Sequence, residues 1–368
     1  MQSPRRERPG ALAGLRVLEF AGLGPAPFAA MLLADMGADV VRIERPGGGG
    51  MERGPTLRGR RTLALDLKHA GDLKTVRQLA ECAEVLIEGF RPGVMERLGL
   101  GPSPLLATNP RLVYGRMTGW GQTGPKSRTA GHDINYIAIT GALGAIGAAD
   151  RPPAVPLNLI GDYGGGALYL VAGLLAALIS ARGNGGGQVV DCAICDGVVS
   201  MLSLFHCFNG EGSWRTEREM NLLDGGAHFY ATYECKDGLY LAVGAIEPQF
   251  YAVLRERMGL TDPAFDDQRD RDRWPSLKQK LAAVFMTRTR DEWMVLLAGT
   301  DACVSPVLSL ADSRADAHLL ARGSFTEVDG LPQPAPAPRF SATPSFARAS
   351  AAVASACELL DEWRAKGR

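Results

Sequence analysis

The stretch from residue 15 to residue 44, LRVLEFAGLGPAPFAAMLLADMGADVVRIE, decides the fold. It predicts a strand over 15–20, a helix from Pro25 to Met36 and a second strand over 39–44. The alternation continues with a helix over 70–82 and strands over 85–88 and 111–117. Strands separated by helices predict a parallel, doubly wound sheet of the Rossmann-like α/β class. Ligands of such sheets lie outside the carboxyl ends of the strands.

The loops that usually hold nucleotides in such sheets are missing from the sequence. Gly22-Leu23-Gly24 follows the first strand, but Pro25 comes next and the third glycine of a dinucleotide fingerprint is absent. No Walker-type Gly-x4-Gly-Lys-Ser/Thr occurs either. The sheet must therefore hold its ligand in some other way.

A second domain is expected after about residue 226. Two alternating apolar runs, 229–234 and 239–243, flank Asp237-Gly238, which is a strong hairpin signal. Helical segments follow to about residue 300, so this region is predicted to be a smaller α+β domain. The predicted division is a large domain over 1–200 and 335–368, a linker over 201–225 and a small domain with return linker over 226–334. A final helix near 346–363 is expected to pack back onto the large domain.

The bulk composition favours a small-molecule enzyme. The 40 basic and 40 acidic side chains give no electrostatic reason to expect nucleic acid or a membrane surface as partner. The longest apolar run, 167–179, is shorter than the ~20 residues that span a bilayer, so a buried core helix is expected. The basic N-terminus lacks the apolar region of a signal peptide, and the C-terminus lacks the peroxisomal tripeptide. A cytoplasmic location is therefore predicted.

The seven cysteines predict no metal site. Cys192-x-x-Cys195 is the only close pair, and no second pair or His pair accompanies it in the pattern that zinc requires. Reduced, mostly buried thiols are expected.

The hexapeptide Gly131-His132-Asp133-Ile134-Asn135-Tyr136 points to acid–base chemistry, because it places an imidazole beside a carboxylate at the start of an apolar stretch. Taken singly, His132 is more often a structural histidine, Asp162 an N-cap and Glu247-Pro248 a turn. Six motifs that occur together in order favour functional roles for these three residues instead. They are 41–46 (VRIERP), 63–68 (LALDLK), 91–99 (RPGVMERLG), 119–125 (GWGQTGP), 131–136 (GHDINY) and 244–251 (GAIEPQFY).

With these motifs the chain resembles the α-methylacyl-CoA racemases of the family III CoA-transferase (CaiB/BaiF-like) superfamily, over about residues 12–338. The resemblance implies a homodimer of interlocked rings, in which the small domain of one subunit caps the large domain of the other. It also implies an acyl-CoA thioester substrate, a place in fatty acid metabolism and no separate cofactor, because CoA is part of the substrate.

The resemblance assigns the CoA site to the large domain. Arg45 and Lys68 are expected to contact phosphates, with Arg97 as a further phosphate contact. Ala64, Leu65, Asp66 and Leu67 are expected to line the path of the adenine and pantetheine groups. The remaining residues of the hexapeptide, Gly131, Asp133, Ile134, Asn135 and Tyr136, are expected to contact the substrate. Without the resemblance each arginine would read as a solvated surface charge.

The resemblance also implies catalytic roles. Racemisation removes the α-proton on one face of a thioester and returns a proton on the other, which needs two bases. His132 is expected to serve one face and Asp162 the other, while Glu247 fixes the imidazole tautomer. Asp162 is expected just before a helix that begins near Gly164, where backbone N–H groups would favour its carboxylate and the developing enolate.

Two other functions are compatible with the same residues. A CoA-transferase of this superfamily would use Asp162 as a nucleophile, through an acyl anhydride and a CoA thioester. An acyl-CoA-binding protein would perform no turnover. An oriented imidazole at His132 with Glu247 favours the racemase, because a single-nucleophile transferase does not need it.

Two further features stay open in the sequence. His228 stands where the family usually has proline, and a flexible, titratable residue on that loop could alter acyl entry or do nothing. Met201, Leu202, Leu204, Phe205 and Phe208 could line an acyl pocket, although such a stripe at helical spacing is more often plain core.

Overall fold

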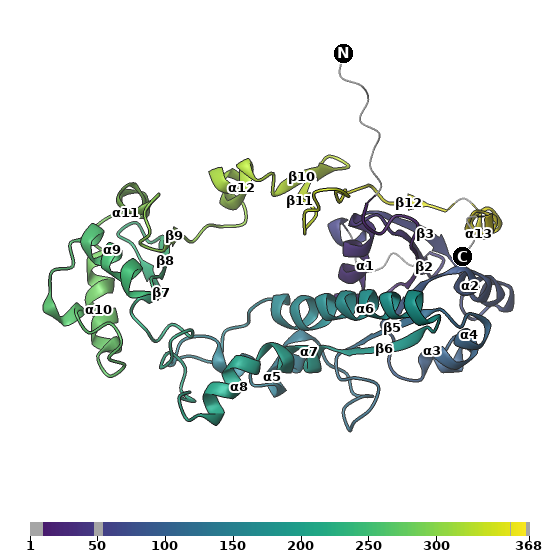
Figure 1. The fold of residues 1–368 in the computed structure, drawn as a ribbon, viewed down its shortest axis with the longest axis horizontal. Coiled ribbons are helices and arrows are strands. Elements are labelled where there is room, and N and C mark those ends of the chain that lie inside the picture. The colour runs from purple at the N-terminus through teal and green to yellow at the C-terminus, as the bar shows by residue number, and fades with distance from the viewer. Residues whose placement is uncertain (1–9, 48–53, 354, 366–368) are drawn as a thin grey trace, which may run out of the picture. The chain divides into compact units, whose positions relative to one another are not determined.

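The computed structural model describes residues 10–47, 54–353 and 355–365. The chain divides into two compact units (Figure 1). Unit 1 is drawn from residues 1–140, 157–201 and 317–368, and unit 2 from residues 141–156 and 202–316. The residues on which the signal-peptide and peroxisomal expectations rest, 1–9 and 366–368, lie outside the described ranges.

Unit 1 is an α/β unit in which most strands alternate with helices. Its strands are β1 (Arg16–Phe20), β2 (Asp39–Glu44), β3 (Arg60–Ala64), β4 (Val85–Glu88), β5 (Val113–Thr118), β6 (Gln188–Ala193), β10 (Phe325–Val328), β11 (Leu331–Pro334) and β12 (Ala351–Ala352). Its helices are α1 (Pro25–Asp35), the 3-10 turn η1 (Gly54–Leu57), α2 (Ala70–Cys82), α3 (Val94–Arg97), α4 (Pro102–Thr108), α5 (Asp133–Ile139), the π-helix η3 (Leu159–Leu168), α6 (Tyr169–Asn184), α7 (Ile194–Met201), α12 (Ala317–Ala321) and α13 (Ala356–Ala365).

The predicted doubly wound sheet is confirmed. Seven strands pair in the order β12-β3-β2-β1-β4-β5-β6, and every neighbouring pair is parallel. The chain adds β2 and β3 on one side of β1 and then β4, β5 and β6 on the other. The strand order therefore reverses between β1 and β4, which is where such sheets open a crevice at their carboxyl edge.

Helices cover both faces of this sheet (Figure 1). On one face α2, α4 and α13 enclose a core that includes Leu79, Leu105 and Trp363, all less than 3% exposed. On the other face α6 packs so closely on β5 that a Cβ on Gly115 would lie 2.9 Å from a methyl carbon of Leu174. Burial of apolar side chains on both faces explains why β1, β2 and β4 are rich in Val, Leu and Ile.

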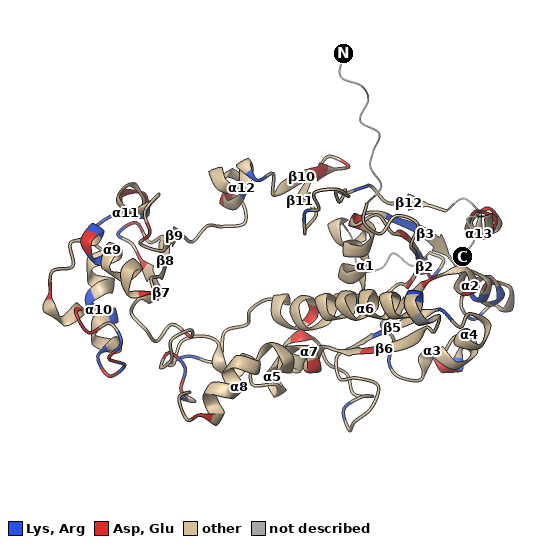
Figure 2. Cartoon of the chain, in the orientation of Figure 1, with Lys and Arg blue, Asp and Glu red and all other residues tan. Residues whose placement is uncertain are grey.

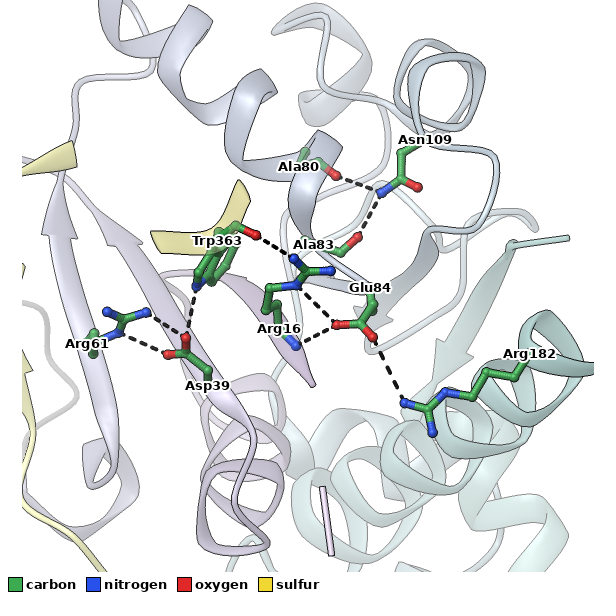
Figure 3. A network of polar contacts seen from close by, with 9 residues as sticks. All are labelled: Arg16, Asp39, Arg61, Ala80, Ala83, Glu84, Asn109, Arg182 and Trp363. Carbon is green, nitrogen blue, oxygen red and sulfur yellow. Dashed lines mark hydrogen bonds and ion pairs between the residues drawn. The ribbon is translucent and has the colours of Figure 1, made fainter. Parts of the chain in front are cut away.

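The C-terminal helix α13 is fastened to the start of the sheet by polar contacts (Figure 3). The Trp363 indole donates to Asp39 Oδ2 at 2.9 Å, and Arg16 Nη1 donates to the Trp363 carbonyl at 2.7 Å. Arg61 joins Asp39 to Glu362 with two ion pairs of 2.6 Å. The last helix lies at Ala356–Ala365, where the sequence predicts it near 346–363, and it packs on unit 1.

A buried carboxylate holds three central strands together. Glu19 on β1 is fully buried and pairs with Arg42 on β2 at 2.8 Å and with Arg60 on β3 at 3.0 Å. Removing one partner of such a buried pair typically costs about 3–5 kcal/mol, because the remaining charge is left without compensation.

The long apolar helix differs from its prediction. Helical structure begins at Leu159 as a π-helix with Asn158 as its N-cap, so Asp162 lies inside the first turn and the predicted start near Gly164 is wrong. The stretch from Leu159 to Gly183 is long and apolar enough to cross a membrane, and half of its most apolar window is buried. Figure 2 draws nearly all of α6 in tan, so its exposed side is also free of charge along most of its length.

Unit 2 holds the predicted hairpin. Its strands are β7 (Tyr230–Glu234), β8 (Tyr240–Gly244) and β9 (Val304–Pro306), and β8 pairs antiparallel with both others. Its helices are η2 (Leu143–Ala145), α8 (Ser203–Gly210), α9 (Pro248–Met258), η4 (Pro263–Phe265), α10 (Trp274–Phe285), α11 (Arg290–Leu297) and η5 (Asp312–Ala315). Acidic and basic residues are neighbours on α9 and α11, whereas the charged residues of α10 are both lysines (Figure 2).

Residues 141–156 belong to unit 2, whereas the sequence scheme places them in the large domain. The Arg218 guanidinium donates to the carbonyls of Ala148 and Arg151, and the Ala149 N–H donates to Glu219. Unit 2 also ends at residue 316 rather than 334, because the β10–β11 hairpin docks on unit 1 through Arg58, which donates to the Pro334 carbonyl at 2.7 Å.

His228 is a core residue of unit 2 rather than part of a flexible loop. It is fully buried, and its Nε2 lies 2.7 Å from the hydroxyl of Tyr251. The hydroxyl of Tyr233 donates to the His228 carbonyl at 2.5 Å. Burial without a charged partner lowers the pKa of His228 from 6.5 to about 4.

This burial predicts a pH-dependent stability. Between pH 6.5 and pH 4 the unfolded chain binds a proton at His228 and the folded chain does not, so stability present above pH 6.5 is lost as the pH falls. Relative to His228→Gln, which keeps a donor for Tyr251 but does not titrate, the wild-type protein should lose about 2 kcal/mol of unfolding free energy between pH 7 and pH 5. Denaturant unfolding at fixed protein concentration measures this, and a difference that does not change with pH would contradict it.

Candidate active site

A pocket of about 390 Å³ opens at the carboxyl edge of the sheet, beside the reversal of strand order. Residues at or just after the ends of β1, β2, β3 and β4 line it, together with the first residue of α3 and the residue that caps its C-terminus. They are Phe20, Ala21, Ile43, Glu44, Arg45, Leu65, Asp66, Leu67, Lys68, Phe90, Val94 and Leu98.

The pocket combines an apolar wall with cations. Phe20, Leu65 and Phe90 provide flat or branched apolar surface, while Arg45 and Lys68 are exposed. Arg45 has no ion-pair partner among the described residues. Such a site suits a planar apolar group that carries anionic substituents, because guanidinium and ammonium groups pair well with phosphate oxygens.

Most of the predicted CoA-binding residues meet in this pocket. Arg45 and the run from Leu65 to Lys68 line it, and Ala64 is the last residue of β3 directly before that run. Asp66 turns its carboxylate back onto the Lys68 N–H at 3.0 Å, so it orders the loop. Arg97 does not line the pocket and lies on α3 beside Gly93, where an added Cβ would be 3.3 Å from its Nη1.

The hexapeptide forms the start of α5. His132 is the N-cap of that helix, and its backbone N–H donates to the Asn135 side chain at 3.0 Å. The imidazole is exposed, as are Ile134 and Asn135. His132 therefore presents a titratable ring to solvent at a fixed point of the backbone.

Tyr136 fixes the loop before α5. Its hydroxyl donates to the Gly131 carbonyl, and its ring stands edge-on to Trp120 with centroids 4.7 Å apart. An added Cβ on Gly119 would lie 2.0 Å from the Tyr136 ring, so only glycine fits there. Burial first, and then the nearby Asp162 carboxylate, raise the pKa of Tyr136.

Asp162 stands in the first turn of η3, which belongs to unit 1 as His132 does. The side-chain amide of Asn158 donates to Asp162 Oδ2 at 3.4 Å. An added Cβ on Gly24, directly before α1, would lie 2.7 Å from the same oxygen. Gly24 thus leaves room for the carboxylate at the carboxyl edge of β1.

Asp133 joins the two base-bearing segments. Its Oδ1 accepts the backbone N–H of Asp162 at 2.7 Å. The Gly161 N–H also donates to this carboxylate. These N–H groups are therefore occupied by Asp133 and do not face a developing enolate, contrary to what the resemblance led us to expect.

Glu247 is carried by unit 2. It is the N-cap of α9 and is exposed. Burial, and then the Glu247 carboxylate, raise the pKa of the Cys303 thiol. His132 and Asp162 thus share unit 1, while the third predicted catalytic residue belongs to the other unit.

The two cysteines of the close pair are chemically quiet. Burial raises the pKa of Cys192 to about 12 and that of Cys195 to about 11, so both thiols stay protonated at neutral pH. Among residues 10–47, 54–353 and 355–365, no group of three or more His, Cys, Asp or Glu side chains is placed to hold a metal ion.

The predicted acyl-pocket stripe divides between two surroundings. Phe205 and Phe208 line a cavity of about 240 Å³ in unit 2, together with Trp214, Leu222 and Trp274. Met201 and Leu204 are exposed. The stripe is therefore not a continuous core face.

Comparison with known proteins identifies the family. The profile of CoA-transferase family III matches residues 12–357. The chain belongs to CoA-transferase family III. Mouse α-methylacyl-CoA racemase is 46% identical over 335 residues, which cover 91% of this chain and 87% of that protein. Human α-methylacyl-CoA racemase is 45% identical over 329 residues, covering 89% and 86%.

Solved structures agree with that assignment. A CaiB/BaiF family protein from Brucella suis superposes with a TM-score of 0.81 at 27% identity, covering 97% of this chain and 100% of that one. The family III match includes both units, so the pocket, the hexapeptide and Glu247 all lie within it.

Sequence reasoning missed several residues of the site. Phe20, Phe90, Val94 and Leu98 line the pocket, and Gly24 borders Asp162. All but Val94 and Leu98 lie at or just after the end of a predicted strand. The rule that ligands bind at the carboxyl ends of strands is therefore the signal that could have found them.

Proposed function

We propose that the chain racemises 2-methylacyl-CoA thioesters at the α-carbon. The observation that carries this is the 46% identity to mouse α-methylacyl-CoA racemase over 91% of the chain. The joining of the His132 and Asp162 segments through Asp133 supports the same conclusion, because a two-base reaction needs two proton carriers at a fixed separation.

The reaction follows from the chemistry of the thioester. One base breaks the α-carbon–hydrogen bond, and the electron pair moves onto the thioester carbonyl to form an enolate. The conjugate acid of the second base then returns a proton to the opposite face. His132 and Asp162 are the proposed pair, and Glu247 is proposed to orient the imidazole.

The CoA portion is proposed to occupy the pocket at the carboxyl edge of the sheet. The apolar wall of Phe20, Leu65 and Phe90 suits the adenine ring, and Arg45 and Lys68 suit the phosphates. Arg97 is proposed as a further phosphate contact on α3. The reaction itself needs no separate cofactor, and a cytoplasmic location without nucleic-acid or membrane partners remains our prediction.

Exchange of the α-proton tests the proposal. Incubated in D₂O with either epimer of a 2-methylacyl-CoA, without added metal or nucleotide, the protein should introduce one α-deuterium and convert each epimer to a mixture. Mass spectrometry and chiral analysis of the released acid measure this, and a sample without protein controls for spontaneous exchange. Transfer of CoA to a free acid without α-exchange would assign the transferase activity instead.

We further propose that the active protein is an interlocked homodimer. On unit 1, large apolar side chains of η3, α6 and α7 remain exposed in the single chain, with Ile179 exposed by 74%. The others are Leu159, Leu168, Tyr169, Val199 and Met201. Large apolar side chains exposed in such number on neighbouring helices suit an interface. A second copy is the proposed occupant because the family resemblance implies an interlocked pair.

Sedimentation tests the homodimer. The wild-type protein should sediment at twice the 39.2 kDa chain mass, and Ile179→Glu should shift the distribution toward smaller or aggregated species. Val295→Glu on α11 is the matched control, because Val295 is 85% exposed on unit 2 and lies outside this surface. A stable, active wild-type monomer would contradict the interlocked arrangement.

A further inference from the structure

The side chain of Asp133 turns into the protein rather than toward solvent. It follows His132 directly as the first residue of α5 and is 9% exposed. Its Oδ1 accepts the Asp162 N–H at 2.7 Å, across 29 residues of sequence. An added Cβ on Gly161 would lie 2.2 Å from the same oxygen, so the η3 backbone approaches Asp133 as closely as only glycine permits.

This contact is made at an energetic cost. Oδ2 of Asp133 is buried and has no hydrogen-bond partner among the described residues. Burial raises the pKa of the Asp133 carboxyl, while the N–H groups of Asp162 and Gly161 lower it. A buried oxygen without a partner needs an explanation, because burying a polar group without a hydrogen bond is unfavourable. In return, the Asp133 carboxylate accepts charge-assisted hydrogen bonds from two adjacent backbone N–H groups.

The hydrogen bonding by Asp133 connects α5 to η3, two helices that are separated in the sequence. α5 carries His132 at its N-cap, and η3 carries Asp162 in its first turn. π-helical turns are rare and are frequently found at functional sites. The first N–H groups of a helix lack a partner within the helix, and Asp133 supplies one for the Asp162 N–H, beside both proposed bases.

We propose that Asp133 is a positioning residue that fixes the spacing between His132 and Asp162 by holding the Gly161 and Asp162 N–H groups. The catalytic consequence rests on the proposed racemase function, whereas the hydrogen bonding itself does not. Asp133 thus acts through its carboxylate on the backbone of η3 and needs no contact with the substrate.

Amide hydrogen exchange tests the hydrogen bonding between Asp133 and the η3 backbone without a measurement of activity. In Asp133→Ala, the amides of Gly161 and Asp162 should exchange at least 10-fold faster than in the wild-type protein. In Asp133→Asn they should stay closer to the wild-type rate, because the side-chain carbonyl can still accept. Thr140→Val is the matched control, since it removes the hydrogen bond from Thr140 to the Ile137 carbonyl at the other end of α5. Unchanged exchange in a folded Asp133→Ala protein would overturn the proposal.

Kinetics test the consequence. In Asp133→Ala, kcat for racemisation should fall about 100-fold with KM changed less than 3-fold, since misplacing a catalytic group by about 1 Å has that effect. Asp133→Asn should recover most of the rate, and Thr140→Val should retain it. Faster amide exchange with an unchanged racemisation kcat would refute the positioning role. A wild-type protein without racemisation would refute the proposed function, while the amide exchange would still test the hydrogen bonding by Asp133.

Discussion

The sheet of unit 1 depends on the return of the chain from unit 2. The polypeptide leaves unit 1 after residue 201 and re-enters it at residue 317. The last helix then packs against a sheet whose strands β1 to β5 lie within the first 120 residues. Arg16 and Asp39 at the start of that sheet hold Trp363 of α13 (Figure 3). Arg61 pairs with Asp39 and with Glu362 of the same helix. With α13 in place, Trp363 completes the apolar core against α2. An interaction between the two ends of the chain therefore stabilises the scaffold on which the site stands.

The scaffold places binding and chemistry on different elements. The carboxyl ends of β1, β2, β3 and β4 build the pocket, where short loops present Arg45 and the run from Leu65 to Lys68. The proposed bases stand on α5 and η3, and both segments are fixed to each other by Asp133. Rigid attachment matters most at the bases, because proton transfer requires positions held to fractions of an ångström. Arg45 and Lys68 are exposed at the pocket, and guanidinium and ammonium groups pair well with phosphate oxygens.

Local patterns predicted the parts of the fold that local physics controls. The strands at 16–20, 39–44 and 85–88, the helix at 70–82 and the Asp237-Gly238 hairpin follow from apolar periodicity and turn chemistry. β3 was not foreseen, since its polar residues Arg60 and Arg61 are buried or half-buried by ion pairs with distant carboxylates. The π-helix start at Leu159 and the burial of His228 were equally hidden, because packing against other elements sets both. The residues of the pocket came from family motifs, whereas the inward turn of Asp133 depends on the close approach of Gly161, which no pattern records.

The central claim is that His132 and Asp162 serve opposite faces of the α-carbon. The most direct test is α-proton exchange from each separate epimer of a 2-methylacyl-CoA, measured for His132→Ala and Asp162→Ala with folding checked by thermal unfolding. Racemisation should fall at least about 100-fold in each variant, as loss of a general base typically causes. Each variant should still exchange one epimer preferentially, through the base that remains, and the preferred epimer should reverse between the two variants. Equal and undiminished exchange of both epimers by both folded variants would contradict the account.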